Sequence, residues 1–257
     1  MSDIANQFIN LGTTITESTL VYRVFSKQRL LEMFTDKKLT LVAPHKWEDP
    51  FENFLSKCKA TVDGIPNVAL SGIFKNYYGQ CWTINPQSDA MWRIYSPNKD
   101  GARVCTTVGR LIRTIYDAKN PFAHMSYYIG SVGYETESDL RKLFEHPANA
   151  TGVALDGTGK NQAMTFFLKR KEFEHEAEVR LLYQFNRENF SGQRPEDIWQ
   201  FAIDTNTLFD DVLFDPRMDA NDFRQGEQTL RSLGFNNPIA QSTLYQLPNL
   251  KITIRTH

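Results

Sequence analysis

Residues 176–185 carry the strongest strand pattern in the chain. Every second residue from Ala177 to Phe185 is hydrophobic, which is typical of a strand with one face on a hydrophobic core. The opposite face carries Glu176, Glu178 and Arg180. The pattern therefore predicts a strand over Glu176–Phe185 from which two carboxylates and a guanidinium point in the same direction.

Further strands and helices alternate along the chain. Leu20–Phe25 is a compact strand pattern, and Ser26 after it can cap a helix. The other predicted strands are 39–43, 79–83, 102–108, 125–134, 201–203, 212–214, 239–242 and 251–254, and further helices are predicted over 67–78, 89–95 (capped by Ser88) and 221–233. Some links are too short for helical crossovers. We therefore expect the α+β class, with a mixed, mostly antiparallel sheet and flanking helices.

The composition is that of a globular protein with a substantial core. The 257 residues include 29 Lys and Arg against 30 Asp and Glu, and 41% of the chain is hydrophobic. These values rule out intrinsic disorder, and the net charge of −1 argues against a whole-surface nucleic-acid or membrane binder. No repeat or Pro/Gly-rich linker divides the chain. We expect one domain over 1–257, with 1–18 as a flexible or loosely packed segment.

Cysteine usage and the N-terminal sequence indicate the cytoplasm. Cys58, Cys81 and Cys105 are odd in number and lack a C-x-x-C spacing, so we expect reduced thiols. No hydrophobic run approaches the ~18 residues of a membrane span. Residues 1–22 lack the basic and hydrophobic regions of a signal peptide. We therefore expect a cytoplasmic protein that does not engage a membrane.

Glu176 and Glu178 form the first candidate site. Carboxylates two residues apart on one strand face lie roughly 7 Å apart. One can then act as a general base or electrostatic stabiliser while the other orients a substrate hydroxyl, and Arg180 would favour their charged forms. The alternative is a solvated strand face whose ion pair contributes little. The spacing alone favours this alternative.

Arg23 and the predicted helix 89–95 provide further candidates. Arg23 lies within a hydrophobic strand, and a buried arginine needs an anion, either a protein carboxylate or a ligand phosphate. Met91, Trp92 and Tyr95 share helix surfaces and could stack on a planar ring. Each feature taken alone is better explained structurally, by an ion pair for Arg23 and by core packing for the aromatic residues.

Two charged segments give weaker signals. Residues 48–52 hold three carboxylates near His45, but no H-x-x-x-H or E-x-x-H pairing accompanies them. A cap formed by Asp49 is therefore a simpler explanation than a metal site. We expect the basic run Lys169–Lys171 on a solvated face, with attraction of a polyanion as the alternative. Walker-type, G-x-G-x-x-G and G-x-S-x-G motifs are absent, which excludes the P-loop and serine-hydrolase classes.

The order of several short motifs resembles the bacterial DUF2971 family, a family of unknown function. The motifs are Tyr22-Arg23-x-Phe25-Ser26, Trp47-x-Asp49-Pro50-Phe51-Glu52, Cys81-Trp82-Thr83, Met91-Trp92-x-x-Tyr95, Phe173-x-x-Glu176-x-Glu178-x-Arg180 and Ser242-x-x-Tyr245. They cover nearly the whole chain. The family usually has Asn where this chain has Glu48, and often Ser where it has Thr83.

A more distant resemblance implies a function. An arginine on the first strand, a Ser/Thr on a middle strand and a late Glu-x-Glu are similar to the Arg–Ser–Glu scheme of ADP-ribosyltransferases, whose split, mostly antiparallel sheet has a cleft for NAD. The resemblance implies that Arg23 binds the pyrophosphate or the nicotinamide ribose. It also implies that Thr83 fixes the first strand or a ribose. Glu178 would hold the ribose 2′-hydroxyl and stabilise the developing cation, while Glu176 would orient or deprotonate the acceptor.

The same resemblance implies further NAD contacts. Tyr22, Trp92 or Tyr95 would flank the nicotinamide ring, and Arg180 completes the set of candidate NAD-binding residues. A single ligand, NAD, would satisfy the arginine, the paired carboxylates and the aromatic rings together. We therefore expect an ADP-ribosyltransferase-like enzyme that consumes NAD, acts as a toxin or phage-defence effector, needs no metal and modifies a protein or nucleic-acid acceptor.

Two other functions stay open from the sequence. A metal-dependent nuclease would hold Mg²⁺ with Glu176, Glu178 and Asp49. A non-catalytic sensor or partner-binding module would use the Arg and Glu residues as one structural ion network.

Overall fold

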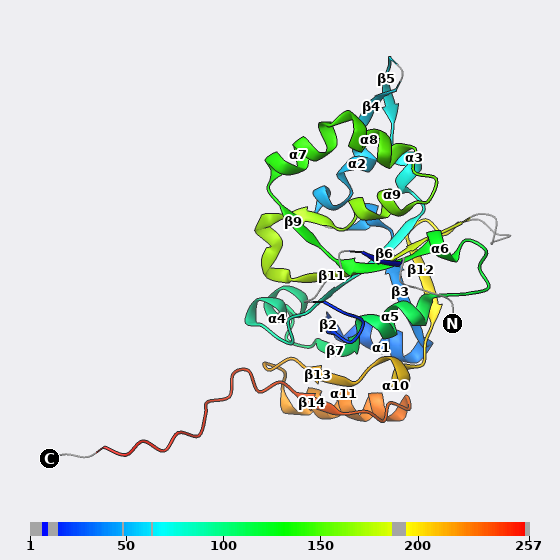
Figure 1. Ribbon diagram of the computed structural model, residues 1–257. Coiled ribbons are helices and arrows are strands. Elements are labelled where there is room, and N and C mark those ends of the chain that lie inside the picture. Colours follow the sequence, from blue (N-terminus) through cyan, green and yellow to red (C-terminus); the bar gives the residue numbers. More distant parts are fainter. Residues whose placement is uncertain (1–6, 10–14, 48, 63, 187–193, 255–257) are drawn as a thin grey trace.

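A ten-stranded sheet runs through the middle of the molecule, with helices on both sides (Figure 1). The computed structural model describes residues 7–9, 15–47, 49–62, 64–186 and 194–254. The strands of the sheet are β1 (Phe8–Ile9), β2 (Leu20–Phe25), β3 (Lys38–Val42), β6 (Tyr77–Thr83), β7 (Ala102–Thr107), β8 (Tyr127–Ser131), β11 (Glu178–Gln184), β12 (Ile198–Ala202), β13 (Asp211–Phe214) and β14 (Ile239–Gln241). Two small ladders pair β4 (Lys59–Val62) with β5 (Ile65–Ala69), and β9 (Gly133–Glu135) with β10 (Leu168–Arg170).

The helices surround this sheet. They are α1 (Lys27–Asp36), α2 (Phe54–Lys57), α3 (Ser71–Phe74), α4 (Asp89–Tyr95), α5 (Val108–Ile115), α6 (Ala123–Ser126), α7 (Glu137–Glu145), α8 (Pro147–Ala154), α9 (Lys160–Thr165), α10 (Thr205–Leu208) and α11 (Ala220–Ser232). The 3₁₀ helices are η2 (Pro44–Lys46), η3 (Pro50–Asn53) and η4 (Lys171–Glu176). Most strand pairs of the sheet are antiparallel, whereas β1–β8 and β13–β14 are parallel. The predicted α+β class with a mixed, mostly antiparallel sheet is confirmed.

The sheet is split at β6. One edge of β6 pairs along its length with β11. The other edge pairs with two different strands: Thr83 pairs with Tyr22 of β2, and Gly79 pairs with Val42 of β3. Strand β2 leads on to β7, β13 and β14, whereas β3 leads to β12. We call the place where β2 and β3 diverge from β6 the fork.

Hydrophobic cores cover both faces of the central strand β11. Leu181 packs in a large core with residues of α1, α5 and α11, while Leu182 packs in a second core with residues of α8, α9 and β8. Figure 1 shows these two sets of helices on opposite sides of the sheet. The face that carries Glu178 and Arg180 is therefore also enclosed, although the alternation alone favoured a solvated face.

Three predicted helix caps are confirmed. Ser26 accepts a hydrogen bond from Arg29 N at the start of α1, and Ser88 accepts one from Met91 N at the start of α4. Asp49 caps η3 by accepting a hydrogen bond from Phe51 N (3.0 Å). These caps could be predicted because they depend on residues close together in the sequence.

Several predicted boundaries are wrong. The strand predicted over Glu176–Phe185 begins at Glu178, because Ala177 has a left-handed backbone (φ 44°) that ends the preceding η4. The segment predicted as a helix over 67–78 contains the end of β5, the short α3 and the start of β6. The predicted strand 125–134 divides into β8 and β9, and residues 251–254 are exposed and not in a strand.

The N-terminal segment is described only in part. Of residues 1–18, expected to be loosely packed, 1–6 and 10–14 lie outside the described residues. Phe8–Ile9 pairs with β8, and Ile9 is only 2% exposed. Gly130 of β8 allows this approach, because a Cβ there would lie 1.9 Å from the carbonyl oxygen of Ile9. Within the described ranges, no helix is both long and hydrophobic enough to cross a membrane.

Candidate functional site

Lys169 of β10 binds three carboxylates at one point. Its Nζ lies 2.6 Å from Oε2 of Glu176, 3.0 Å from Oε1 of Glu52 and 3.4 Å from Oε2 of Glu178. The Lys169 side chain is only 7% exposed. The sequence analysis placed Lys169 on a solvated face, and that expectation is wrong. Glu176 and Glu178 are brought together by this buried lysine rather than by a shared strand face.

Arg180 is the second cation of this cluster and binds two of the three carboxylates. Its Nε and Nη2 donate to the two oxygens of Glu178 (2.7 and 2.9 Å), and Nη2 also donates to Glu52 (2.8 Å). Its Nη1 donates to the carbonyl oxygen of Phe166, and its guanidinium lies 4.5 Å from the ring of Trp47. The Arg180 side chain is fully buried. Such fork-to-carboxylate pairing fixes Glu178 in one orientation.

The cluster keeps Glu178 ionised. Burial alone would raise the pKa of this carboxyl, but Arg180 and Lys169 outweigh burial and lower its pKa to about 2. Burial lowers the pKa of Lys169, and the carboxylates of Glu178, Glu52 and Glu176 more than reverse this, so its pKa is raised. Three carboxylates face two cations, which leaves a formal excess of one negative charge.

Tyr22, Thr83 and Glu178 lie in one row across three strands. Thr83 of β6 pairs in register with Tyr22 on one side and with Glu178 on the other, and residues paired in this way share a sheet face. The Thr83 hydroxyl donates to the carbonyl oxygen of Glu176 (2.6 Å) and accepts from Asn85 N (3.1 Å). Thr83 therefore ties the end of β6 to the start of β11.

Arg23 reaches into the fork without an acidic partner. Its Nη1 donates to the carbonyl oxygen of Cys81, and its guanidinium lies 5.1 Å from the ring of Phe25. Among the described residues, Arg23 forms no salt bridge, and its buried Nε has no hydrogen-bond partner. Burial lowers the pKa of Arg23, and the nearby Glu178 partly opposes this shift. The ion pair that the sequence analysis favoured for Arg23 is absent from the described part of the chain.

The aromatic residues of α4 differ in exposure. Trp92 is fully buried and Met91 is 8% exposed, as expected for core packing, whereas Tyr95 is 41% exposed. Burial raises the pKa of the Tyr95 hydroxyl, and Glu176 raises it further. Tyr95 is thus a partly exposed ring at the edge of the carboxylate cluster.

Five residues selected from the sequence line one small cavity. They are Tyr22, Arg23, Thr83, Met91 and Trp92, and Val24, Arg103 of β7 and the loop residues 85–87 complete the wall. The cavity has a volume of about 10 Å³, which is about the space of one water molecule. Glu178 is outside this lining, although its charge acts on Arg23.

Arg103 was not predicted from the sequence, and Glu52 was considered only as one of three carboxylates near His45 and as part of a DUF2971 motif. Arg103 is 8% exposed and donates to Asp211 (2.6 Å) and to the carbonyl oxygen of Pro86 (2.7 Å). Its guanidinium also lies 4.6 Å from the ring of Tyr22. The signal for Arg103 was the same as for Arg23, namely a lone arginine within a hydrophobic strand.

The geometry does not favour the nuclease hypothesis. Glu176 and Glu178 are both bound by Lys169, while Asp49 accepts from Arg170 (3.1 Å). Across the described ranges, no group of three or more His, Cys, Asp or Glu residues is placed to hold a metal ion. Glu48, part of the acidic segment considered from the sequence, lies outside the described residues.

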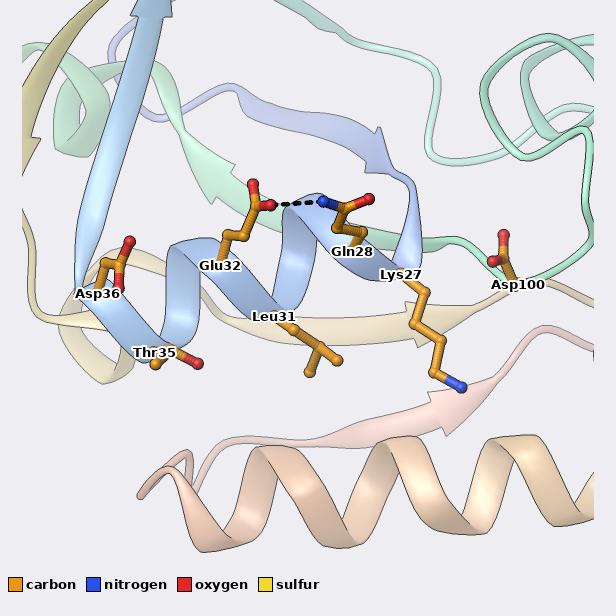
Figure 2. Close-up of a pocket in the computed structure, with 7 residues that line it drawn as sticks. All are labelled: Lys27, Gln28, Leu31, Glu32, Thr35, Asp36 and Asp100. Atoms are coloured by element: carbon orange, nitrogen blue, oxygen red, sulfur yellow. Dashed lines mark hydrogen bonds between the residues drawn. The ribbon is translucent and has the colours of Figure 1, made fainter.

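A larger hollow lies along α1, away from the fork. It has a volume of about 560 Å³ and is lined by Lys27, Gln28, Leu31, Glu32, Thr35, Asp36 and Asp100. Figure 2 shows these side chains, all of them on α1 except Asp100, with Gln28 hydrogen-bonded to Glu32 (2.8 Å). None of the residues predicted for the site lines this groove.

Comparison with known proteins gives one family. The family model described as "Protein of unknown function (DUF2971)" matches residues 91–181. The chain resembles DUF2971, as its motifs predicted. The matched segment runs from α4 to β11 and includes Lys169, Glu176 and Glu178. No curated protein matches the chain.

Solved structures of Thermus sp. 2.9 DarT are also similar to the chain. The complex with NAD+ has a TM-score of 0.40 at 10% identity and covers 89% of this chain and 97% of its own. The complex with ADP-ribosylated ssDNA has a TM-score of 0.40 at 11% identity, with 90% and 97% covered. The carba-NAD+ complex has a TM-score of 0.38 at 11% identity, with 88% and 96% covered.

Proposed function

We propose that the chain binds NAD at the fork and transfers ADP-ribose to a macromolecular acceptor. The observation that carries the proposal is Arg23, a half-buried arginine with an inaccessible, unpartnered Nε and no carboxylate among its described contacts. An arginine without an acid, one of whose donors is buried and unpaired, is suited to an anionic ligand. Arg23 binds the carbonyl oxygen of Cys81 on β6, and Arg180, which holds the ionised Glu178, pairs in register with Cys81 from β11.

The donor set fits NAD chemically, although the cavity is closed. Arg23 can donate to a phosphate, Tyr22 lines the same cavity, and the 41% exposed Tyr95 offers a further aromatic ring on α4. A dinucleotide is far larger than the cavity of about 10 Å³. Binding therefore requires the loop 85–87 to move. This loop is held by hydrogen bonds from Asn85 to His175 (3.1 Å) and from Ser242 to Gln87 (2.6 Å).

Each residue then has a defined task. Bound NAD supplies nicotinamide as the leaving group and ADP-ribose as the group transferred. Arg23 would hold the pyrophosphate, and Glu178 would accept a hydrogen bond from a ribose hydroxyl and stabilise positive charge beside it. Glu176 would orient the acceptor or take its proton, while Thr83 holds Glu176 in place through its main-chain carbonyl.

Nicotinamide release and NAD binding test the proposal. We expect Arg23→Gln to weaken NAD binding at least tenfold, and Glu178→Gln to abolish turnover. Arg110→Gln serves as the matched control. Arg110 lies on α5, pairs with Asp210 and is outside the cavity lining. Binding is measured by calorimetry, and turnover by chromatography with protein and single-stranded DNA as acceptors. A folded wild-type protein that neither binds nor consumes NAD would contradict the proposal.

A non-catalytic module is the second candidate function. It is favoured by the engagement of both Glu178 oxygens by Arg180 and by the 3% exposure of that side chain. In such a module, Glu178→Gln would lower the free energy of unfolding without any activity to lose. Turnover that disappears in a Glu178→Gln protein with an unchanged circular dichroism spectrum would favour the enzyme.

A further inference from the structure

Residues 246–254, which follow β14, expose four large hydrophobic side chains to solvent. We call this segment the arm. Leu247, Leu250, Ile252 and Ile254 are each between 71% and 94% exposed. Soluble proteins rarely leave neighbouring hydrophobic side chains in water, and an exposed set of them marks an interaction site. The arm therefore needs a partner surface.

The arm has the pattern of a strand without a partner. Hydrophobic Leu250, Ile252 and Ile254 alternate with Lys251 and Thr253. An extended backbone places the three hydrophobic side chains on one face and the two polar ones on the other. Residues 251–254, predicted as a strand from the sequence, belong to no strand pair and make no main-chain hydrogen bond within the described part of the chain.

Strand β14 offers an open sheet edge. It is the last strand on its side of the sheet and pairs with β13. The carbonyl oxygen of Pro238 and the N–H of Ser242, the residues next to Ile239 and Gln241, both bond to residues of β13. Main-chain groups of successive residues in a strand point to opposite edges. Those of Ile239 and Gln241 therefore face the open edge.

The core beside this edge is incompletely covered. Ile239 pairs in register with the buried Val212 of β13 and continues its face of the sheet. Ile239 itself is only partly buried, as are Phe223 of α11 and Leu233 just after that helix. The opposite face of β14 carries the exposed Ala240. A strand added beside β14 would thus need one hydrophobic face and one polar face.

The arm matches the edge in both respects. Its main chain can pair with the N–H and C=O groups of Ile239 and Gln241, and its hydrophobic side chains can extend the partly covered core. Lys251 and Thr253 would then lie on the solvated side with Ala240. In strand addition of this kind, main-chain hydrogen bonds provide affinity and alternate side chains provide specificity.

The arm leads away from the edge of its own molecule. Ser242 Oγ donates to Gln87 (2.6 Å), and the Tyr245 hydroxyl donates to Asp89 of α4. These contacts fix the place where the chain leaves β14, and beyond them the arm extends away from the sheet (Figure 1). An extended segment of this length spans at most ~30 Å. The arm is therefore directed at a neighbouring molecule.

We propose that the arm of one molecule adds as a strand to the β14 edge of a second copy of this chain, which returns its own arm in the same way. Each molecule supplies one arm and one edge, so the contact closes as a twofold dimer. Once the first arm is paired, the second pairing is intramolecular, which strengthens the dimer.

Sedimentation velocity over a range of protein concentrations tests the proposal. We expect the wild-type protein to dimerise in the micromolar range. Ile252→Asp places a charge on the hydrophobic face of the arm and should weaken association at least tenfold. Thr253→Asp is the matched control, because it places the same charge on the polar face one residue away, and its dimerisation should equal that of the wild type. A wild-type protein that is monomeric at every concentration would overturn the proposal, as would an Ile252→Asp protein that dimerises like the wild type.

A labelled peptide of residues 246–254 locates the contact. We expect it to bind the monomeric Ile252→Asp protein, whose β14 edge is intact, and the same peptide with Ile252→Asp not to bind. Hydrogen exchange at the amides of Ile239 and Gln241 should slow at least tenfold when the peptide is bound. A peptide that binds without protecting these amides would contradict the β14 edge. A wild-type monomer that already protects them would place the arm on its own edge and overturn the exchange between copies. These measurements do not involve NAD, so their outcome is independent of the proposed function.

Discussion

Arg23 donates a hydrogen bond through Nη1 to the main-chain carbonyl oxygen of Cys81 at the fork of the sheet. Cys81 lies on β6 between Thr83, which pairs with β2, and Gly79, which pairs with β3. The guanidinium therefore satisfies a carbonyl group at the position where the two strands separate. Arg23 is held by the backbone, and its Nε stays available for a ligand.

Replacement of Arg23 and of Arg180 by methionine should affect stability differently. Arg180→Met removes the partner of two buried carboxylates, Glu178 and Glu52, and should lower the free energy of unfolding by about 3–5 kcal/mol. Arg23→Met leaves the Cys81 carbonyl unpaired but also removes a desolvated charge without an acidic partner. We expect its unfolding free energy to stay within about 1 kcal/mol of wild type.

Urea denaturation at pH 7 measures both values. An Arg23→Met protein destabilised as much as Arg180→Met would show that Arg23 belongs to the structural ion network, and the anion-binding role would lose its support.

Stability should fall in acid because of Glu178. Its pKa is lowered from 4.5 to about 2 in the folded protein. A depressed folded-state pKa stabilises the fold above the unfolded pKa, and this contribution disappears as the pH falls from about 4.5 toward 2. The shift of about 2.5 pKa units corresponds to roughly 3 kcal/mol.

The free energy of unfolding measured from pH 7 to pH 2.5 checks this expectation. Glu178→Gln should be less stable than wild type at pH 7, and the gap should narrow in acid. Parallel curves for the two proteins at all pH values would show that the pKa of Glu178 is not depressed.

Lys169 should be more important for stability than its neighbours in the basic run. Lys169→Met removes the cation bound to Glu176 and leaves Glu52 and Glu178 to Arg180 alone, so we expect a loss of about 3–5 kcal/mol. The exposed Lys171 is the matched control, and Lys171→Met should change stability by less than about 0.5 kcal/mol. Similar unfolding midpoints for both variants in urea would be inconsistent with the buried cluster.

Gly79 should not tolerate a side chain. A Cβ at this position would lie 2.6 Å from Cζ2 of Trp47 and 2.8 Å from Cδ2 of Leu182. Gly79→Ala should therefore displace Trp47 from its place over Arg180 and cost about 1–3 kcal/mol. Gly152→Ala in α8 meets no atom within 4 Å and should stabilise the protein by roughly 0.5–1 kcal/mol. Thermal midpoints that shift in the same direction for both variants would contradict this contrast.

Local features of the chain were predictable from the sequence. The strand Leu20–Phe25, the helix that begins after Ser88 and the cap formed by Asp49 all agree with the structure, because each depends on residues within a few positions of one another. The α+β class and the mostly antiparallel sheet followed from the short links between strands.

The environment of the charged residues was not predictable in the same way. The alternation in β11 indicated which residues share a face, but α8 and α9, which cover that face, come from a different part of the chain. Lys169 is buried because Glu52, Glu176 and Glu178 surround it, and the basic run gave no sign of this.

Periodicity and capping determined the individual elements, because those signals arise between near neighbours along the backbone. The fork and the charge cluster were decided by tertiary packing alone. Each requires strands distant in sequence to meet, and a sequence pattern contains no information on which partner a side chain finds across that distance.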